Sequence, residues 1–528
     1  MDIYLYFFES VYVFRFHLFV QYSQIMVYIG VYCTLYTKYR AVFLPNNKQI
    51  YFNGEKMKKK AALLSLGCKV NSYETEYIRE DLIASGFEIV DFSDKADVYI
   101  INTCSVTNIA DRKSRQMLHK AKSMNPDALI VATGCYVQTR KEEELKTDAD
   151  MIIGNNHKGE VAKKISEYFR ELDAEESVTY VDDIAAEKLV EDFSIYDYPE
   201  RSRAFVRIED GCNQFCSYCI IPFARGRVRS RSEEDIVDEV KALADKGFKE
   251  IVLSGIHISS YGYDNYEQTL RAFMQESGTS DAMFGQPLLD LIKKLNAIPG
   301  IERIRLGSLE PRIITDEFVR ELSELKNVCP HFHLSLQSGC DTVLKRMNRH
   351  YTGAEFLDKC DILKKYYDSP SITTDVIVGF PGETAEEFEE SCELLKKVGF
   401  SKIHIFKYSR RAGTVADRMP GQLTDKQKHE RSLKVQAIEE KSGEEYLKSF
   451  VGSKVKILVE ETIDINNTEN AAEQGDGNSI LYKGLTERYV PVEAVYYLKD
   501  DIKPEINDII EVFITGAKEN QALLGKIC

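Results

Sequence analysis

Three cysteines stand close together near the middle of the chain. Cys212, Cys216 and Cys219, the barrel triplet, lie within eight residues in a run that begins at Gly211. Cysteine thiolates are the usual ligands of iron–sulfur clusters, and three of them can hold a four-iron cube that leaves one iron open to a chelating substrate. A structural zinc site is the alternative. It needs a fourth ligand, and no histidine or cysteine follows within thirty residues.

A second set of cysteines is scattered along the sequence but shares one kind of position. Cys68, Cys104 and Cys135, the N-terminal triplet, each follow a predicted strand. The carboxyl ends of parallel strands meet at one edge of a sheet, which is where α/β proteins bind ligands. Three unrelated core cysteines are the alternative, since free cysteine is often buried. The equivalent positions favour a second cluster.

The elements around the N-terminal triplet alternate between apolar runs and helical patterns. Such alternation indicates an α/β fold with a parallel sheet covered by helices. We assign 57–170 to this domain and interpret the acidic, irregular segment 171–200 as a linker. The predicted strands are 61–67, 98–103, 129–134 and 151–154, and the predicted helices are 74–85 and 109–123.

The alternation restarts around the barrel triplet and runs longer, over 201–444. Six βα units favour an open, partial TIM-like barrel over a closed eightfold one. The polar segment 262–287 is longer than a barrel loop needs, and we interpret it as an insertion. The predicted strands are 205–208, 251–254, 303–307, 333–337, 374–378 and 403–408, with helices such as 233–245, 288–296, 316–325 and 385–398.

The tail, 445–528, changes character. Short alternating runs at 454–459, 489–495 and 509–514, with turn residues between them, predict a small β-barrel. The polar, asparagine-rich segment 463–479 is predicted to be a disordered loop within it.

The barrel triplet, placed after the first strand of a partial barrel, resembles the signature of the radical S-adenosylmethionine (SAM) superfamily. The two triplets on these two domains resemble its methylthiotransferases, over about 60–526. The branch that modifies threonylcarbamoyladenosine beside the tRNA anticodon is the most similar, through the runs 65–71, 219–231 and 406–414. The tail resembles the TRAM domain, an RNA-binding module.

The resemblance implies an enzyme with two 4Fe-4S clusters and SAM in two roles. One SAM molecule would donate a methyl group to a sulfur at an auxiliary cluster on the N-terminal triplet. Another would chelate the open iron of the barrel triplet and yield the radical that activates carbon two of the adenine. The implied partners are tRNA, a low-potential electron donor such as flavodoxin or ferredoxin, and a sulfur source. We expect a monomer.

Several residues near the ends of barrel strands are predicted to contact SAM. The family places an aromatic residue before the last cysteine, near the adenine, and a glycine-rich strand end near the amino group of SAM. Further candidates come from the rule that barrel strands end at the active-site mouth, although each is equally plausible as a turn or capping residue. The candidates are Tyr218, Ser254, Gly255, Ser308, Glu310, Gln337 and Asp375.

The net charge of −15 excludes a wholly electrostatic nucleic-acid binder, so RNA contacts must be local. Arg225, Arg227, Arg229 and Arg231 alternate and would share one face of an extended segment. We interpret that face as a site for the phosphate backbone. A solvated loop with scattered ion pairs is the alternative.

The leader, 1–56, shows no domain pattern. Residues 18–37 carry no charge and are long enough for a membrane span, but polar residues and tyrosines weaken that interpretation. Met57 opens a lysine-rich start directly before a predicted strand, so we expect the leader to be a non-native or disordered extension. Twelve cysteines without an evident signal peptide indicate a reducing compartment and a cytoplasmic enzyme.

Two other functions stay open at this stage. One is a methylthiotransferase that acts on isopentenyladenosine in tRNA or on a ribosomal-protein aspartate. The other, of a different class, is a non-catalytic iron–sulfur electron carrier, which would cleave no SAM and leaves the RNA-like tail unexplained.

Overall fold

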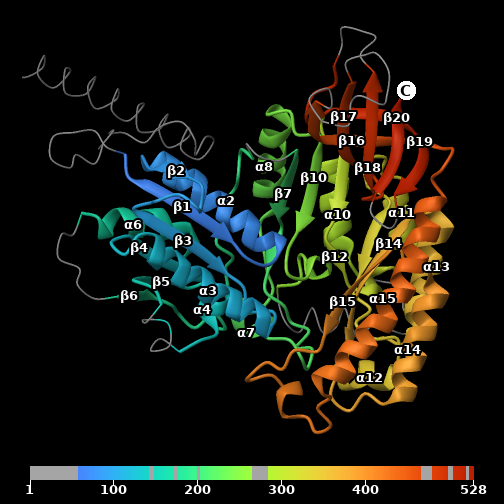
Figure 1. Cartoon of the computed structure of the whole chain (residues 1–528), viewed down its shortest axis with the longest axis horizontal. Coiled ribbons are helices and arrows are strands. Elements are labelled where there is room, and N and C mark those ends of the chain that lie inside the picture. Colours follow the sequence, from blue (N-terminus) through green and yellow to red (C-terminus); the bar gives the residue numbers. More distant parts are fainter. Residues whose placement is uncertain are drawn as a thin grey trace, which may run out of the picture. The chain divides into compact units, whose positions relative to one another are not determined.

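The computed structural model describes residues 58–141, 145, 148–170, 177–198, 202–264, 284–464, 479–497, 503–518 and 522–528 (Figure 1). The leader with its candidate membrane stretch lies outside these residues, as do most of the predicted 262–287 insertion and of the 463–479 loop. Among the described residues, no helix is both long and apolar enough to cross a membrane.

The N-terminal domain is built on one parallel sheet with the strand order β2-β1-β3-β4-β5-β6. Its central strands β3 and β4 are buried along their whole length, as expected for strands covered by helices on both faces. The four predicted strands are confirmed. The strands are β1 (Lys60–Ser65), β2 (Glu88–Val90), β3 (Val98–Thr103), β4 (Leu129–Gly134), β5 (Met151–Ile153) and β6 (Val178–Tyr180).

Two features of this domain differ from the prediction. β6 lies within the segment interpreted as an irregular linker, and it pairs with β5 as the edge strand of the sheet. The first helix begins at Lys69 rather than at residue 74, directly after Cys68. The helices are α2 (Lys69–Ala84), α3 (Asn108–Met124), α4 (Cys135–Gln138), η1 (Lys158–Glu160) and α6 (Val161–Tyr168).

The central domain is an open barrel of parallel strands, as predicted. One sheet has the order β11-β10-β7 and the next β12-β13-β14-β15, and the chain passes directly from β11 to β12 across Gly307. The strands are β7 (Arg203–Arg207), β10 (Glu250–Ser254), β11 (Arg303–Leu306), β12 (Ser308–Leu309), β13 (His331–Leu334), β14 (Ser371–Val378) and β15 (Lys402–Lys407), and a small ribbon pairs β8 (Glu209–Asp210) with β9 (Arg229–Ser230).

Helices follow the barrel strands and bury one apolar face against them. Their starts carry the expected caps: Ser232 accepts from the Asp235 amide, and Thr384 forms a capping box with Glu387. The helices are α7 (Ile221–Arg225), α8 (Glu233–Asp245), α10 (Gln286–Asn296), α11 (Asp316–Ser323), α12 (Asp341–Arg346), α13 (Gly353–Tyr366), α14 (Ala385–Val398) and α15 (Asp425–Lys448), with single turns η2 (Ile258–Ser260), η3 (Pro311–Ile313) and η4 (Ala416–Arg418).

The C-terminal domain is a closed β-barrel with the strand order β16-β17-β18-β20-β19, drawn in red in Figure 1. The prediction of a small barrel is confirmed, although the strands are longer than the predicted runs. They are β16 (Lys454–Asp464), β17 (Ser479–Thr486), β18 (Pro491–Tyr497), β19 (Ile509–Lys518) and β20 (Ala522–Ile527).

The small barrel closes the end of the central domain at which the strands begin. Arg303, the first residue of β11, donates to the carbonyl oxygens of Leu485 and Lys456, both at 2.9 Å. Arg305 pairs with Glu250, the first residue of β10, at 2.8 Å. These charged groups are buried, so the docking of the small barrel on the central domain is specific.

Candidate active site

The N-terminal triplet comes together at the carboxyl edge of its sheet. Each of the three thiols lies near enough for its charge to act on the others. Gly67 has a φ of +102°, and a side chain there would stand 2.7 Å from the Cys104 sulfur. Glycine is therefore required before Cys68, because only bare backbone fits against the neighbouring thiol.

The barrel triplet occupies the loop between β8 and α7. The Cys219 amide donates to the Cys216 carbonyl oxygen at 2.9 Å, which folds the loop so that the thiols lie together. Arg349 Nη1 lies 3.4 Å from the Cys216 sulfur. A thiolate at Cys135 would raise the pKa of Cys219, so the two triplets lie near each other.

Burial raises the pKa of thiols in both triplets. Burial, together with the neighbouring thiols, raises the pKa of Cys104 to about 11. Burial and the charge of Cys216 raise the pKa of Cys219 to about 12. Cluster ligands bind as thiolates, so iron binding at these sites must release protons.

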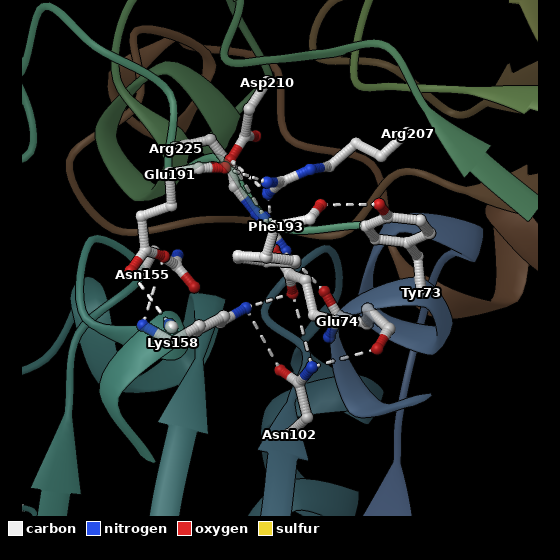
Figure 2. Close-up of polar contacts among 12 residues, drawn as sticks. Tyr73, Glu74, Asn102, Asn155, Lys158, Glu191, Phe193, Arg207, Asp210 and Arg225 are labelled. Atoms are coloured by element: carbon white, nitrogen blue, oxygen red, sulfur yellow. Dashed lines mark hydrogen bonds and ion pairs between the residues drawn. The ribbon is translucent and has the colours of Figure 1, made fainter. Parts of the chain in front are cut away.

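A buried charge network joins the N-terminal domain to the barrel domain (Figure 2). Glu74 of α2 contacts Lys158 of η1 and Arg225 of α7. Arg225 also pairs with Asp210 at 3.2 Å, and Arg207 of β7 lies 3.7 Å from Glu74. All these side chains are almost fully buried, so the network fixes how the two domains pack beside the triplets.

Arg225 links this network to the N-terminal triplet. Its Nε donates to the Cys135 sulfur at 3.3 Å, and its Nη2 donates to Asn71 Oδ1 at 2.6 Å. The same Asn71 oxygen lies 3.8 Å from the Cys68 thiol. One guanidinium group therefore acts on two of the three thiols, one directly and one through an amide.

Cations outnumber carboxylates in this network. Burial by itself raises the pKa of Glu74, but the attraction of Arg225 and Lys158 outweighs it and holds that pKa well below its usual range. A buried excess of positive charge is costly unless an anion completes it, which fits an anionic iron–sulfur cluster on the adjacent thiolates. The cations are Lys158, Arg207, Arg225 and Arg229, and the carboxylates are Glu74, Glu191 and Asp210.

The prediction that four arginines share an exposed RNA-binding face is wrong for three of them. Arg225, Arg229 and Arg231 are buried, and Arg231 pairs with Glu239 at 2.6 Å. The segment is not extended, because α7 runs up to Arg225 and β9 covers only two residues. Alternation therefore does not place the side chains on one face, and only Arg227 of the four is exposed.

Arg227 therefore remains the candidate phosphate contact in this segment. Its guanidinium lies 4.3 Å from the centre of the Phe215 ring. Arg227→Ala is expected to weaken tRNA binding several-fold and to lower the slope of log affinity against log salt by about one, the effect of one lost phosphate contact. Salt titrations of tRNA affinity measure both. Arg320→Ala on α11 is the matched exposed control, and an unchanged slope in Arg227→Ala would move the RNA footprint to the C-terminal barrel.

Of the predicted SAM contacts, Tyr218 lies within the barrel-triplet loop, Gly255 directly follows β10 and Glu310 directly follows β12. Tyr218 packs edge-to-face on Phe380, with ring centres 6.5 Å apart. Glu310 is buried and accepts from the Arg312 amide at 2.9 Å. Gly255 lies so close to Glu209 that any side chain would strike its carboxylate.

The other predicted SAM contacts are placed differently. The Ser254 hydroxyl donates to the Val206 carbonyl oxygen at 3.3 Å, so it holds two strands together. Gln337 has a φ of +68°, and its backbone amide donates to the backbone carbonyl oxygen of Asp375 at 2.9 Å. Ser308 and Asp375 line a cavity beside the C-terminal barrel.

Glu209 and His257 are candidate site residues that the sequence analysis missed. Burial raises the pKa of Glu209 well above its usual range, and one of its carboxylate oxygens, Oε2, has no partner among the described residues. The backbone amide of His257 donates to the other oxygen, and burial lowers the pKa of the His257 ring to about 3. The acidic pair 209–210 directly before the cysteine run was the signal that could have found Glu209.

Family models match both cysteine-bearing domains. Residues 206–395 match the Radical SAM superfamily, and residues 60–154 match Uncharacterized protein family UPF0004. Among solved structures, the radical S-adenosylmethionine methyltransferase TsrM of Kitasatospora setae is 14% identical, with a TM-score of 0.46 over 68% of this chain and 77% of that one.

Curated relatives cover most of the chain. Threonylcarbamoyladenosine tRNA methylthiotransferase MtaB of Aquifex aeolicus is 40% identical over 76% of this chain and 92% of its own length. The MtaB of Bacillus subtilis is 38% identical over 82% and 89%. A tRNA-2-methylthio-N(6)-dimethylallyladenosine synthase of Thermoanaerobacter sp. is 35% identical over 75% and 80%.

The fold and the barrel triplet define a radical SAM enzyme, with SAM and a 4Fe-4S cluster as its cofactors. Within that class, the chain belongs to the methylthiotransferase family. The alternative of a non-catalytic electron carrier is therefore excluded.

Proposed function

We propose that this protein attaches a methylthio group to carbon two of threonylcarbamoyladenosine beside the anticodon of tRNA. One observation carries the proposal: the two cysteine triplets, on a parallel-sheet domain and on a partial barrel, are joined through Arg225, which follows the barrel triplet in α7 and donates to the Cys135 sulfur at 3.3 Å. The relatives named for this activity match most of the chain. The isopentenyladenosine branch is the nearest alternative, because a relative with that activity is 35% identical.

The barrel triplet would hold the cluster that binds SAM, and the N-terminal triplet would hold the auxiliary cluster. When bound, these groups supply the radical and the transferable methylthio group. Arg349 beside Cys216 and Arg225 beside Cys135 would each donate to a cluster sulfur. Such donors stabilise the anionic cluster and orient its ligands.

The remaining partners stay predictions of the family resemblance. They are a low-potential electron donor of the flavodoxin or ferredoxin type and a sulfur source. The monomeric state and the cytoplasmic location are likewise predictions. The C-terminal barrel supports a role in RNA binding through its TRAM-like fold.

The proposal is tested by mass spectrometry of tRNA nucleosides from cells that lack any such enzyme and express this gene. We expect 2-methylthio-threonylcarbamoyladenosine to appear and isopentenyladenosine to stay unmodified. Cys212→Ala is the matched inactive variant and should yield neither product. Methylthiolation of isopentenyladenosine alone would assign the protein to the other branch.

A further inference from the structure

A cavity of about 570 Å³ lies where the three domains meet, bounded by the amino-terminal halves of β13 to β15, by α15, by the start of α2 and by the turn between β17 and β18. Alternate residues of the three strands face it, as the two-residue period of a strand requires. Barrel interiors are normally filled by branched apolar side chains, yet this layer is polar throughout and leaves space. The strand residues are His331, His333, Ser371, Thr373, Asp375, Lys402 and His404.

Lys69 brings a positive charge to this cavity. It is the first residue of α2 and directly follows Cys68 of the N-terminal triplet. A cation is unfavourable at a helix start, where the macrodipole is positive, and no acidic residue in the first turn compensates it. Lys69 forms no ion pair with a residue that the structure describes, so its ammonium group is available to an anion.

Tyr489 forms the wall that the C-terminal barrel contributes. Its φ is +63°, a strained value for a bulky residue. The ring lies 5.0 Å from the His331 ring, 4.7 Å from the Arg305 guanidinium and 5.9 Å from Lys69 Nζ. The strained turn therefore serves to hold an aromatic surface inside the barrel, next to the lysine.

His333 and Asp375 add a donor–acceptor pair to the lining of the cavity. His333 Nε2 lies 3.4 Å from Asp375 Oδ2, and its Nδ1 lies 2.9 Å from the Thr373 hydroxyl. With His404, these two form a group whose ligand atoms lie within 4.8 Å of one another. Lys402 also lines the cavity, but it pairs with Glu439 at 2.8 Å. Lys69 is therefore the lining lysine without a carboxylate partner among the described residues, and a polar ligand with an anionic group fits this lining better than a cation.

We infer that this cavity binds the substituent on N6 of the target adenosine, with Lys69 pairing to its carboxylate and the His333–Asp375 pair binding its hydroxyl group. The inference rests on the proposed function. A threonylcarbamoyl group carries both features, whereas a dimethylallyl group carries neither and would leave the polar layer unsatisfied. The substituent on N6 extends away from carbon two of the adenine. Because Lys69 directly follows Cys68 of the N-terminal triplet, a substituent bound at Lys69 keeps carbon two near the clusters.

The test uses two anticodon stem–loop RNAs, one with threonylcarbamoyladenosine and one whose threonine carboxylate is replaced by a neutral amide. For the wild type, the amide is expected to lower kcat/KM roughly tenfold to a hundredfold, the worth of a charge-assisted hydrogen bond. Lys69→Met should lose the same factor with the carboxylate RNA and discriminate little between the two. Iron content and RNA-independent SAM cleavage, measured on the same preparations, show whether the loss is specific to the RNA. Lys397→Met is the charge-matched control, because Lys397 is an exposed residue of α14.

Retention of the full carboxylate preference by Lys69→Met would overturn the inference. So would one zinc per chain in the purified protein that is lost in His404→Ala. Binding of the two RNAs, measured without turnover, separates the cavity from the reaction. A carboxylate preference without methylthiolation would support the cavity and overturn the proposed function, while equal binding would overturn the cavity assignment.

Discussion

Replacing Cys68, Cys104 and Cys135 together with alanine is expected to lower the iron content of the reconstituted protein from about eight to about four atoms per chain. Methylthiolation should fall to background, because the auxiliary cluster is where the transferred sulfur would be held. Release of 5′-deoxyadenosine from SAM should persist, since it needs only the barrel triplet. Iron analysis, electron paramagnetic resonance and product analysis on one preparation measure all three.

The reverse pattern is expected for Cys212→Ala, which should lose SAM cleavage and keep the auxiliary cluster. Cys360→Ala controls for loss of a buried thiol, because Cys360 packs in the barrel core away from both triplets. Its iron content should match that of the wild type. A triple variant that kept about eight irons would show that the N-terminal triplet binds no cluster.

Arg225→Gln is expected to destabilise the protein strongly and to deplete the auxiliary cluster. The change leaves Glu74 and Asp210 with less compensating charge inside the interface between the domains. Breaking a buried ion pair in this way costs about 3–5 kcal/mol, and the hydrogen bond to Cys135 is lost as well. Urea unfolding and iron content per chain measure the two effects.

Arg225→Lys separates cluster tuning from folding. Lysine keeps the charge but cannot reproduce the planar fork that reaches Glu74, Asn71 and Cys135 together. We expect this variant to bind both clusters, with the auxiliary midpoint potential shifted to a more negative value because a donor to a cluster sulfur is gone. Arg227→Gln, two residues further on and exposed, should alter neither stability nor potential. Wild-type stability and iron in Arg225→Gln would refute the role of the network.

The arginine-rich segment 225–231 shows that a local sequence pattern cannot predict whether side chains are buried or exposed. Alternating arginines predict a charged face only if the segment is extended and solvated. Here α7 turns the chain. The carboxylates that pair with the buried arginines come from other parts of the sequence, such as Glu74 on α2 and Glu239 on α8. A single-sequence pattern carries no information about such long-range partners, so a buried interface was predicted to be an RNA surface.

The sequence by itself determined the three-domain α/β architecture, the six barrel strands, the terminal β-barrel and the six cysteines of the two triplets. These follow from hydrophobic periodicity and from residues at strand ends, which are local properties. Only the tertiary structure decided that Arg225 touches Cys135, that Ser254 bonds to backbone, and that Lys69 shares a cavity with Asp375 and Tyr489. Those contacts join residues that are far apart in the sequence, and their energies depend on burial, which exists only once the chain has folded.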